Sequence, residues 1–295
     1  MEGANLRAAS LRNATLTGAS LQDALLQPQK VNGVSRPVDL RFARIRNANL
    51  SNAQMQRVLL AEAEFIDSVL TGANLMHASM SPGPVISRSN MEQAYLIKAD
   101  MAGIVLENSN LSNAILISAD LTNASLAHSN FVEAQLTKAN LRNANLDHTD
   151  MSRAFVLNAD LTNASLRNAN LNGAILLSSA MDKANLTSAN LESAQLSKAT
   201  FIDADLTGAV LGNAFLVEAD LSGAIMKSAV LTNADFKNAN LSAATLTGAT
   251  VTNAVFSGAE FNGTILTDII GMTCEQLKTA RNWRKSVRTG ALKQC

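Results

Sequence analysis

Histidine and carboxylate side chains are the groups in this chain whose spacing could support metal binding or acid–base chemistry. Of the three histidines, His128 and His148 are separated by four lengths of a five-residue repeat, and Asp147 is adjacent to one of them. Two imidazoles and a carboxylate form a common set of zinc ligands. Asparagine occupies the equivalent positions at the same interval to either side, at Asn108 and Asn168. Any polar residue therefore serves at this position, and we expect no metal there.

Four aspartates are spaced by multiples of this same interval, and such a row could hold a divalent cation or supply an acid–base pair. They are Asp100, Asp120, Asp160 and Asp220. Regular spacing is also typical of a solvated acidic side, which is the interpretation we favour. The chain has no nucleophile elbow and no glycine-rich phosphate loop. We therefore expect no enzyme and no cofactor.

The internal repeat of five residues must position these groups. Every fifth residue from Met91 to Leu266 is apolar, and these 36 central positions hold 24 leucines, five methionines, five phenylalanines and two valines. The residue two before the centre is alanine in 29 of the 36 cases. A period of five fits neither the helix nor the strand period. Leucine and alanine two apart both point inward only if the backbone is extended, so the other residues must turn a corner. The pattern predicts narrow coils stacked by backbone hydrogen bonds.

This repeat, as in ADLTNASLRNANL over residues 159–171, resembles the pentapeptide-repeat family. The resemblance covers about residues 4–266 and implies an all-β solenoid, a right-handed quadrilateral β-helix with four pentapeptides in each coil. It also implies that the central residue and the small residue two before it point inward. With four pentapeptides in each coil, the repeat predicts about 12 coils. The frequent Ala-Asn-Leu tripeptide of the repeat indicates a bacterial protein.

Residues 1–266 are expected to form the solenoid, with two loops at 27–39 and 81–90. The five-residue register shifts in these two segments, and all four prolines lie there. Proline cannot donate a ladder hydrogen bond, so these segments are expected to leave the coils.

Residues 267–295 are expected to form a helical cap and a basic tail, because the repeat stops after Leu266. Thr273 and Gln276 have the spacing of a helix capping box. Four apolar residues are expected to share one face of the cap helix: Leu277, Ala280, Trp283 and Val287. The end of a solenoid exposes apolar core and unpaired backbone, which such a cap would cover.

The chain has 24 basic and 24 acidic residues, which argues against nucleic-acid binding through bulk positive charge. The charges are distributed unevenly along the chain. Residues 1–60 carry 8 basic and 3 acidic groups, and residues 61–266 carry 10 basic and 19 acidic groups. Residues 267–295 carry 6 basic and 2 acidic groups. The body is therefore acidic and both ends are basic.

The two cysteines, Cys274 and Cys295, are interpreted as neither a disulfide framework nor a metal site, because they are few and lack a CxxC spacing. The N-terminus has no apolar signal-peptide region, and no apolar run approaches the roughly 20 residues that a membrane-spanning helix needs. We expect a cytoplasmic protein without a membrane span. Whether a targeting segment or a further domain precedes residue 1 stays open.

One side of the predicted solenoid is apolar on its outer surface. The residues before and after each centre should point outward, and on this side most of them are large and apolar. They are Tyr95, Ile97, Ile115, Ile117, Phe155, Leu157, Ile175, Leu177, Phe215 and Val217. Gln135 and Gln195 interrupt the series. Two interpretations are open. In the first, another segment covers this side or its side chains only stabilise the stacked strands. In the second, this side is an interface with a second copy or with a partner protein.

Three functions are compatible with these features. The first is a non-enzymatic scaffold that binds another protein through the flat apolar side. The second is a DNA mimic that binds a DNA-handling enzyme such as gyrase, because the resemblance implies that some relatives protect gyrase. This chain departs from those relatives in its zero net charge and basic ends. The third is a secreted effector. We expect a protein partner or a homodimer, and no direct contact with nucleic acid.

Overall fold

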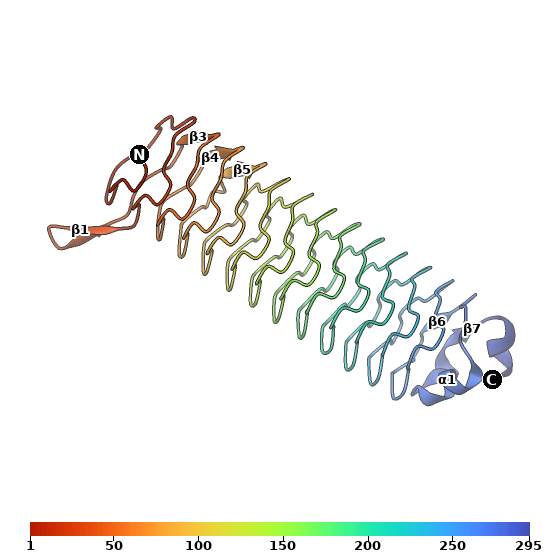
Figure 1. Ribbon diagram of the computed structural model, residues 1–295. Helices are drawn as coiled ribbons and strands as arrows, with labels where there is room; N and C mark the ends of the chain where they lie inside the picture. The colour runs from red at the N-terminus through yellow and green to blue at the C-terminus, as the bar shows by residue number, and fades with distance from the viewer. The chain divides into compact units, whose positions relative to one another are not determined.

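The computed structural model describes all 295 residues and divides into two compact units, Met1–Asp150 (unit 1) and Met151–Cys295 (unit 2). Each unit is a stack of coils, as Figure 1 shows. In both units the residue before each centre pairs in parallel with a residue one coil later, usually four pentapeptides on. Tyr95 pairs with Ile115 in unit 1, and Ile175 pairs with Gln195 in unit 2. The five-residue repeat is therefore built as a parallel β-ladder.

Most of the ladder consists of single-residue bridges, and only short segments extend into strands. In unit 1 these are β1 (Gln29–Val31) and β2 (Val34–Arg36), which pair antiparallel, and β3 (Arg44–Arg46), β4 (Glu64–Ile66) and β5 (Val85–Ser87), which form a parallel sheet. In unit 2 they are β6 (Ile265–Leu266) and β7 (Val287–Arg288), with helix α1 (Cys274–Thr279) and 3-10 helices at Trp283–Lys285 and Gly290–Gln294. None of these helices has the length and apolarity that a membrane crossing needs.

Left-handed residues make the corners of the coils. The second residue after a centre usually has a positive φ, for example 57° at Asn113 and 59° at Asn163. The carbonyl of Leu161 accepts a hydrogen bond of 2.9 Å from the backbone N–H of Ala164, which closes one such corner. Asparagine and glycine tolerate this conformation better than other residues. This preference explains why the repeat so often has Asn or Gly at the second position after the centre.

The core of each unit is the column of central residues. Every centre from Leu21 to Leu266 is at most 1 % exposed, and from Ala24 onward the alanines two before the centres are buried beside them. Near the end of unit 2 the rings of Phe236 and Phe256 stack with centroids 5.3 Å apart. The inward assignment of the repeat therefore holds along both units.

Serine replaces the inward alanine at four successive coils of unit 1, at Ser68, Ser89, Ser109 and Ser129, and all four are buried. The hydroxyl of Ser89 donates to the carbonyl of Phe65 over 3.0 Å and accepts from the backbone N–H of Ser68 over 3.2 Å. Ser109 makes the equivalent pair of bonds. Because backbone groups satisfy these buried hydroxyls, the serines have a structural role.

The segment predicted as a first loop, 27–39, contains a β-hairpin but is shorter than predicted, because Val38 is fully buried and Asp39 pairs with Leu59 in the ladder. β1 and β2 are joined by Asn32 and Gly33, whose φ angles of 52° and 78° fit a two-residue hairpin turn. The hairpin is largely exposed and projects from the end of unit 1 that carries the N-terminus (Figure 1). The Asn-Gly pair between two valines was the sequence signal for it.

Removing this hairpin should leave unit 1 folded. Deleting residues 28–36 and replacing Pro37 by asparagine restores the five-residue register between Leu26 and Leu40. We expect a melting temperature within a few degrees of the parent, because surface excursions tolerate shortening. The same deletion with Pro37 retained should melt clearly lower, because proline cannot adopt the positive φ of the corner. If both deletions melted alike, the register assignment here would be wrong.

The second predicted loop, 81–90, is wrong in extent. Residues 85–87 form β5, which pairs in parallel with β4, and Ile86 is a fully buried centre. Glu64 pairs with Val85, which lies one position further along the chain than a regular coil would place its partner. A single residue has therefore been inserted into this coil. Only the short stretch 81–84, with its two prolines, departs from the repeat.

The C-terminal segment has the predicted capping box. The Thr273 hydroxyl accepts from the backbone N–H of Gln276 over 3.1 Å, and the Gln276 side chain accepts from the backbone N–H of Thr273 over 2.8 Å. The predicted common helix face is wrong, because α1 ends at Thr279. Leu277 and Trp283 are buried, but Val287 lies in β7 and is exposed.

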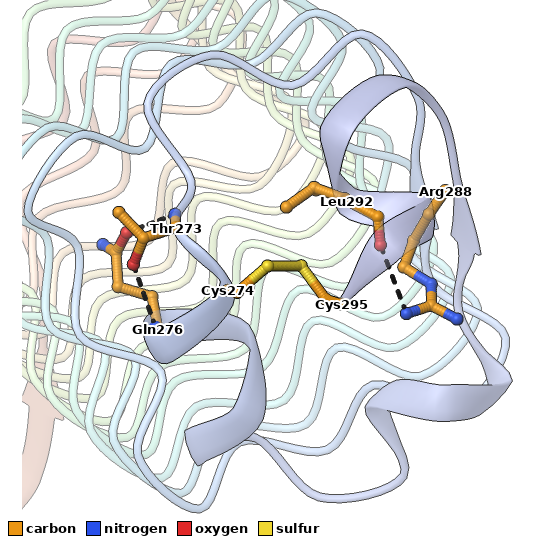
Figure 2. Close-up of a disulfide and its surroundings, with 6 residues drawn as sticks. All are labelled: Thr273, Cys274, Gln276, Arg288, Leu292 and Cys295. Carbon is orange, nitrogen blue, oxygen red and sulfur yellow. Dashed lines mark hydrogen bonds between the residues drawn. A yellow bond between two sulfur atoms is a disulfide. The ribbon is translucent and has the colours of Figure 1, made fainter.

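The interpretation of the cysteines is also wrong. Cys274 and Cys295 form a disulfide with their Cα atoms 5.4 Å apart (Figure 2). The bond joins the start of α1 to the last residue of the chain. Their separation in sequence concealed this pairing, because the pairing depends on how the irregular segment folds back.

Candidate protein-binding surface

The ladder determines which side chains of unit 2 face outward. The centre points into the core, so the residues immediately before and after it point away from the coil. Phe155 pairs with Ile175, and Gln195 pairs with Phe215, so side chains of successive coils lie one above another. Parallel ladders space such neighbours about 4.8 Å apart. Equivalent positions on successive coils therefore form one continuous surface within the unit.

One surface of unit 2 is apolar, and we call it the apolar side of unit 2. It is formed by Phe155, Leu157, Ile175, Leu177, Phe215 and Val217. Phe155 is 41 % exposed and Phe215 is 51 % exposed. The four aliphatic residues are less exposed than these two rings. Large aromatic side chains are usually well buried in a monomer, so their exposure makes this side a candidate interaction surface.

A shallow hollow interrupts this side. It has a volume of about 370 Å³ and is lined by Leu177, Gln195, Ser197 and Phe215. The hollow exists because Ser197 is small, whereas the equivalent residues one coil before and one coil after it are Leu177 and Val217. An apolar side chain of a partner could insert here, with Gln195 available for a hydrogen bond.

In unit 2 the C-terminal segment does not cover this side. α1 lies against residues 254–257, where the Gln276 side chain donates a hydrogen bond of 2.9 Å to the carbonyl of Ala254. Phe215 lies two coils earlier in the repeat and remains half exposed. The alternative in which this segment folds back over the apolar side is therefore not observed.

Unit 1 carries a smaller group of the same kind. Tyr95 is 43 % exposed, and Ile97, Ile115 and Ile117 are half-buried. Tyr95 pairs with Ile115, and Ile115 pairs with Gln135, at which the apolar series ends in this unit. All ten residues of the predicted apolar side thus point outward within their own units.

The aspartates of the predicted acidic side are engaged by the backbone. Each accepts a hydrogen bond from the N–H two residues on; the lengths are 3.4 Å at Asp100, 3.0 Å at Asp120, and 2.9 Å at both Asp160 and Asp220. Asp220 also accepts from the side chain of Asn240 over 3.0 Å. Asparagine accepts the same hydrogen bond elsewhere; the side-chain oxygen of Asn190, for example, accepts from the backbone N–H of Glu192. These carboxylates therefore shape the corners of the coils.

The rings of His128 and His148 stack, as their equivalent places on successive coils predict. Their centroids are 4.8 Å apart and the planes are almost parallel. No third histidine, cysteine or carboxylate forms a metal-binding group with them.

Two ion pairs of unit 1 shift the pKa values of their aspartates. The Arg41 guanidinium donates two hydrogen bonds to Asp39, at 2.9 and 2.7 Å, and lowers the pKa of that carboxyl below its ordinary value. Arg88 lowers the pKa of Asp67 in the same way. Both pairs are at the surface, where such contacts contribute little to stability.

The chain belongs to the pentapeptide-repeat family, whose members fold as right-handed β-helices. The family model for pentapeptide repeats matches residues 1–27, 38–81, 89–126, 119–156, 129–168, 139–176, 164–201, 199–238 and 234–270. The comparison with curated proteins found no match.

Several solved structures of pentapeptide-repeat proteins are similar to this chain. HetL, a protein involved in heterocyst differentiation regulation in the cyanobacterium Nostoc sp. strain PCC 7120, is 28 % identical, covers 88 % of this chain and 90 % of its own, and has a TM-score of 0.28. QnrB1, a plasmid-mediated fluoroquinolone resistance protein, is 16 % identical over 71 % of this chain and 93 % of its own, with a TM-score of 0.31. A pentapeptide-repeat protein of the Arabidopsis thaliana thylakoid lumen is 32 % identical, covers 47 % of this chain and 74 % of its own, and has a TM-score of 0.20.

Proposed function

We propose that this protein is a non-enzymatic scaffold that binds another protein through the apolar side of unit 2. The observation that carries the proposal is the exposure of Phe155 and Phe215 on one side of a regular ladder. Aromatic anchors at the centre of a buried patch contribute most of the binding energy in protein interfaces. A continuous β-ladder holds these anchors in place before binding, which lowers the entropic cost of association.

The hollow between Leu177 and Phe215 supports the same proposal. Interfaces pair a protruding apolar anchor with a complementary recess. This side offers both, because Phe215 projects at the rim and Ser197 lies in the recess. The partner is therefore expected to present at least one large apolar side chain to the recess and its own apolar groove to the phenylalanines.

Replacing both phenylalanines by glutamate should abolish partner binding without unfolding unit 2. The Phe155→Glu/Phe215→Glu protein places two charges in the proposed interface, so we expect at least a tenfold loss of the captured partner. Affinity capture from cells of the native organism, with quantification of the retained proteins, measures this loss.

The matched control is Asn185→Glu/Thr245→Glu. These residues also precede centres and are half-buried, but they lie on another side of unit 2. A partner lost from the phenylalanine variant and retained by the control supports the proposal. A partner retained equally by both variants would contradict it. Light scattering of the parent and the phenylalanine variant tests whether the partner is a second copy.

A further inference from the structure

The segment of unit 2 that follows the repeat carries positive charge that no carboxylate pairs with. Residues 267–295 hold six cationic side chains and two carboxylates. None of the six forms an ion pair, whereas arginines of unit 1 such as Arg41 and Arg88 do. The six are Lys278, Arg281, Arg284, Lys285, Arg288 and Lys293. Cations without a counter-ion leave a positive potential at the surface of this segment.

The carboxylates close to this segment are bound by uncharged donors. Glu260, in the last coil, accepts from the side-chain amide of Asn282 over 2.9 Å and from the backbone N–H of Asn262 over 3.1 Å. Asp268 accepts from the hydroxyl of Thr289 over 3.3 Å. These two carboxylates are thus held by neutral groups, and the cations remain open to an anion from outside the chain.

Two of the cations are held against one aromatic ring. The guanidinium carbons of Arg284 and Arg288 lie 4.6 and 5.2 Å from the ring centroid of Trp283, which is only 9 % exposed. The face of an indole attracts a guanidinium, so the ring fixes both arginines close together. Their like charges repel each other, and an anion that binds beside them lowers this repulsion.

A hollow lies beside this cluster. It has a volume of about 290 Å³ and is lined by Ala280, Asn282, Trp283, Arg284 and Lys285. The last three form a 3-10 helix, in which the backbone N–H of Lys285 donates to the carbonyl of Asn282 over 2.9 Å. An arginine fork binds a carboxylate through two parallel hydrogen bonds, and a lysine adds a point charge. The hollow can therefore receive a carboxylate side chain.

We propose that this surface binds an acidic segment of a partner protein. We call it the basic surface, and it is formed by Arg281, Arg284, Lys285 and Arg288 around Trp283. One carboxylate of the partner enters the hollow, and neighbouring carboxylates contact the other cations. The basic surface is separate from the apolar side of unit 2, so the scaffold acquires a second place at which a protein can bind.

The structure favours a protein segment over a membrane or a nucleic acid. Membrane-bound proteins insert exposed aromatic rings among lipids, and single-stranded nucleic acids stack their bases on such rings. The ring of Trp283 is covered instead. The coils of unit 2, residues 151–266, carry 6 basic and 9 acidic side chains. They would repel an extended polyanion but not a short acidic segment that reaches only the basic surface.

Tryptophan fluorescence tests the proposal at the site itself, because Trp283 is the only tryptophan of the chain. Titration with a decaglutamate peptide should change the fluorescence in a saturable way, and decaglutamine should not change it. The affinity should fall as the salt concentration rises, because exposed charges are screened. The absence of a saturable change with decaglutamate would overturn the proposal.

Anisotropy of a labelled decaglutamate peptide measures the effect of substitutions. Arg284→Gln/Lys285→Gln should raise the dissociation constant at least tenfold. Lys227→Gln/Lys237→Gln removes two exposed cations from the coils of the same unit and should change it less than about twofold. Arg284→Lys/Lys285→Arg keeps both charges and should bind within about threefold of the parent, which separates loss of charge from loss of folding.

Three outcomes would contradict the assignment of the basic surface. In the first, the Arg284→Gln/Lys285→Gln variant binds the peptide like the parent. In the second, the two glutamine variants lose binding equally. In the third, phosphatidylcholine vesicles with about 30 % phosphatidylserine, or a short DNA duplex, bind more tightly than the peptide. The Phe155→Glu/Phe215→Glu variant leaves the basic surface intact and should bind the peptide, so this test is independent of partner capture through the apolar side.

Discussion

Leu186→Asp should lower the free energy of unfolding by at least about 4 kcal/mol, because it removes a fully buried leucine and places a carboxylate in an apolar core. Leu186 is 0 % exposed, and the equivalent centres one coil before and one coil after it, Leu166 and Leu206, are equally buried. No cationic side chain can reach the narrow interior that these leucines and the inward alanines fill. We expect the variant to be largely unfolded or to melt far below the parent, as circular dichroism would show.

The control for this prediction is Ser188→Asp. Ser188 is an exposed corner residue with a φ of 57°, a conformation that aspartate tolerates. The same carboxylate two residues away should therefore change the melting temperature little. Similar melting of the two variants would show that the central position of the repeat does not point inward.

Replacing Cys274 and Cys295 together by serine should destabilise the C-terminal segment by about 3 kcal/mol, the value expected when a cross-link closes a loop of about 20 residues. The disulfide connects the first turn of α1 to the segment that buries Leu292 and follows β7 (Figure 2). Without it, the pairing of β7 with β6 should fray, because that pairing comprises only two residues of each strand.

Hydrogen exchange measures this fraying directly. The backbone N–H of Val287 donates to the carbonyl of Thr264 over 2.8 Å and should exchange much faster in the serine variant. A reductant should have the same effect on the parent and none on the variant. Unchanged protection of Val287 in the variant would show that the segment is held without the disulfide.

The repetitive part of the fold could be predicted from the sequence because the residue types within each pentapeptide indicate which positions point inward and which point outward. An apolar residue such as Leu206 and the alanine two before it recur in one register, and Asn at the corner identifies the left-handed residue. The outward placement of Phe155 and Phe215 followed from the same register.

The irregular parts could not be predicted because they depend on contacts between distant residues. Cys274 and Cys295 meet only because β7 returns to the last coil, and no local pattern indicates that return. The two prolines near Ile86 predict a loop, whereas the structure inserts a single residue into the coil. The spacing of Val287 predicts a helix face, whereas pairing with β6 places this residue in a strand.

Photo-cross-linking from the apolar side tests the proposed function most directly. A benzophenone amino acid at position 215 replaces one aromatic ring by another and should therefore preserve binding. Irradiation in cells of the native organism should attach the chain to a partner protein from position 215, and the same group at position 245, on another side of unit 2, should not. A cross-link of equal yield at both positions, or none at position 215, would contradict the assignment of the apolar side as the binding surface.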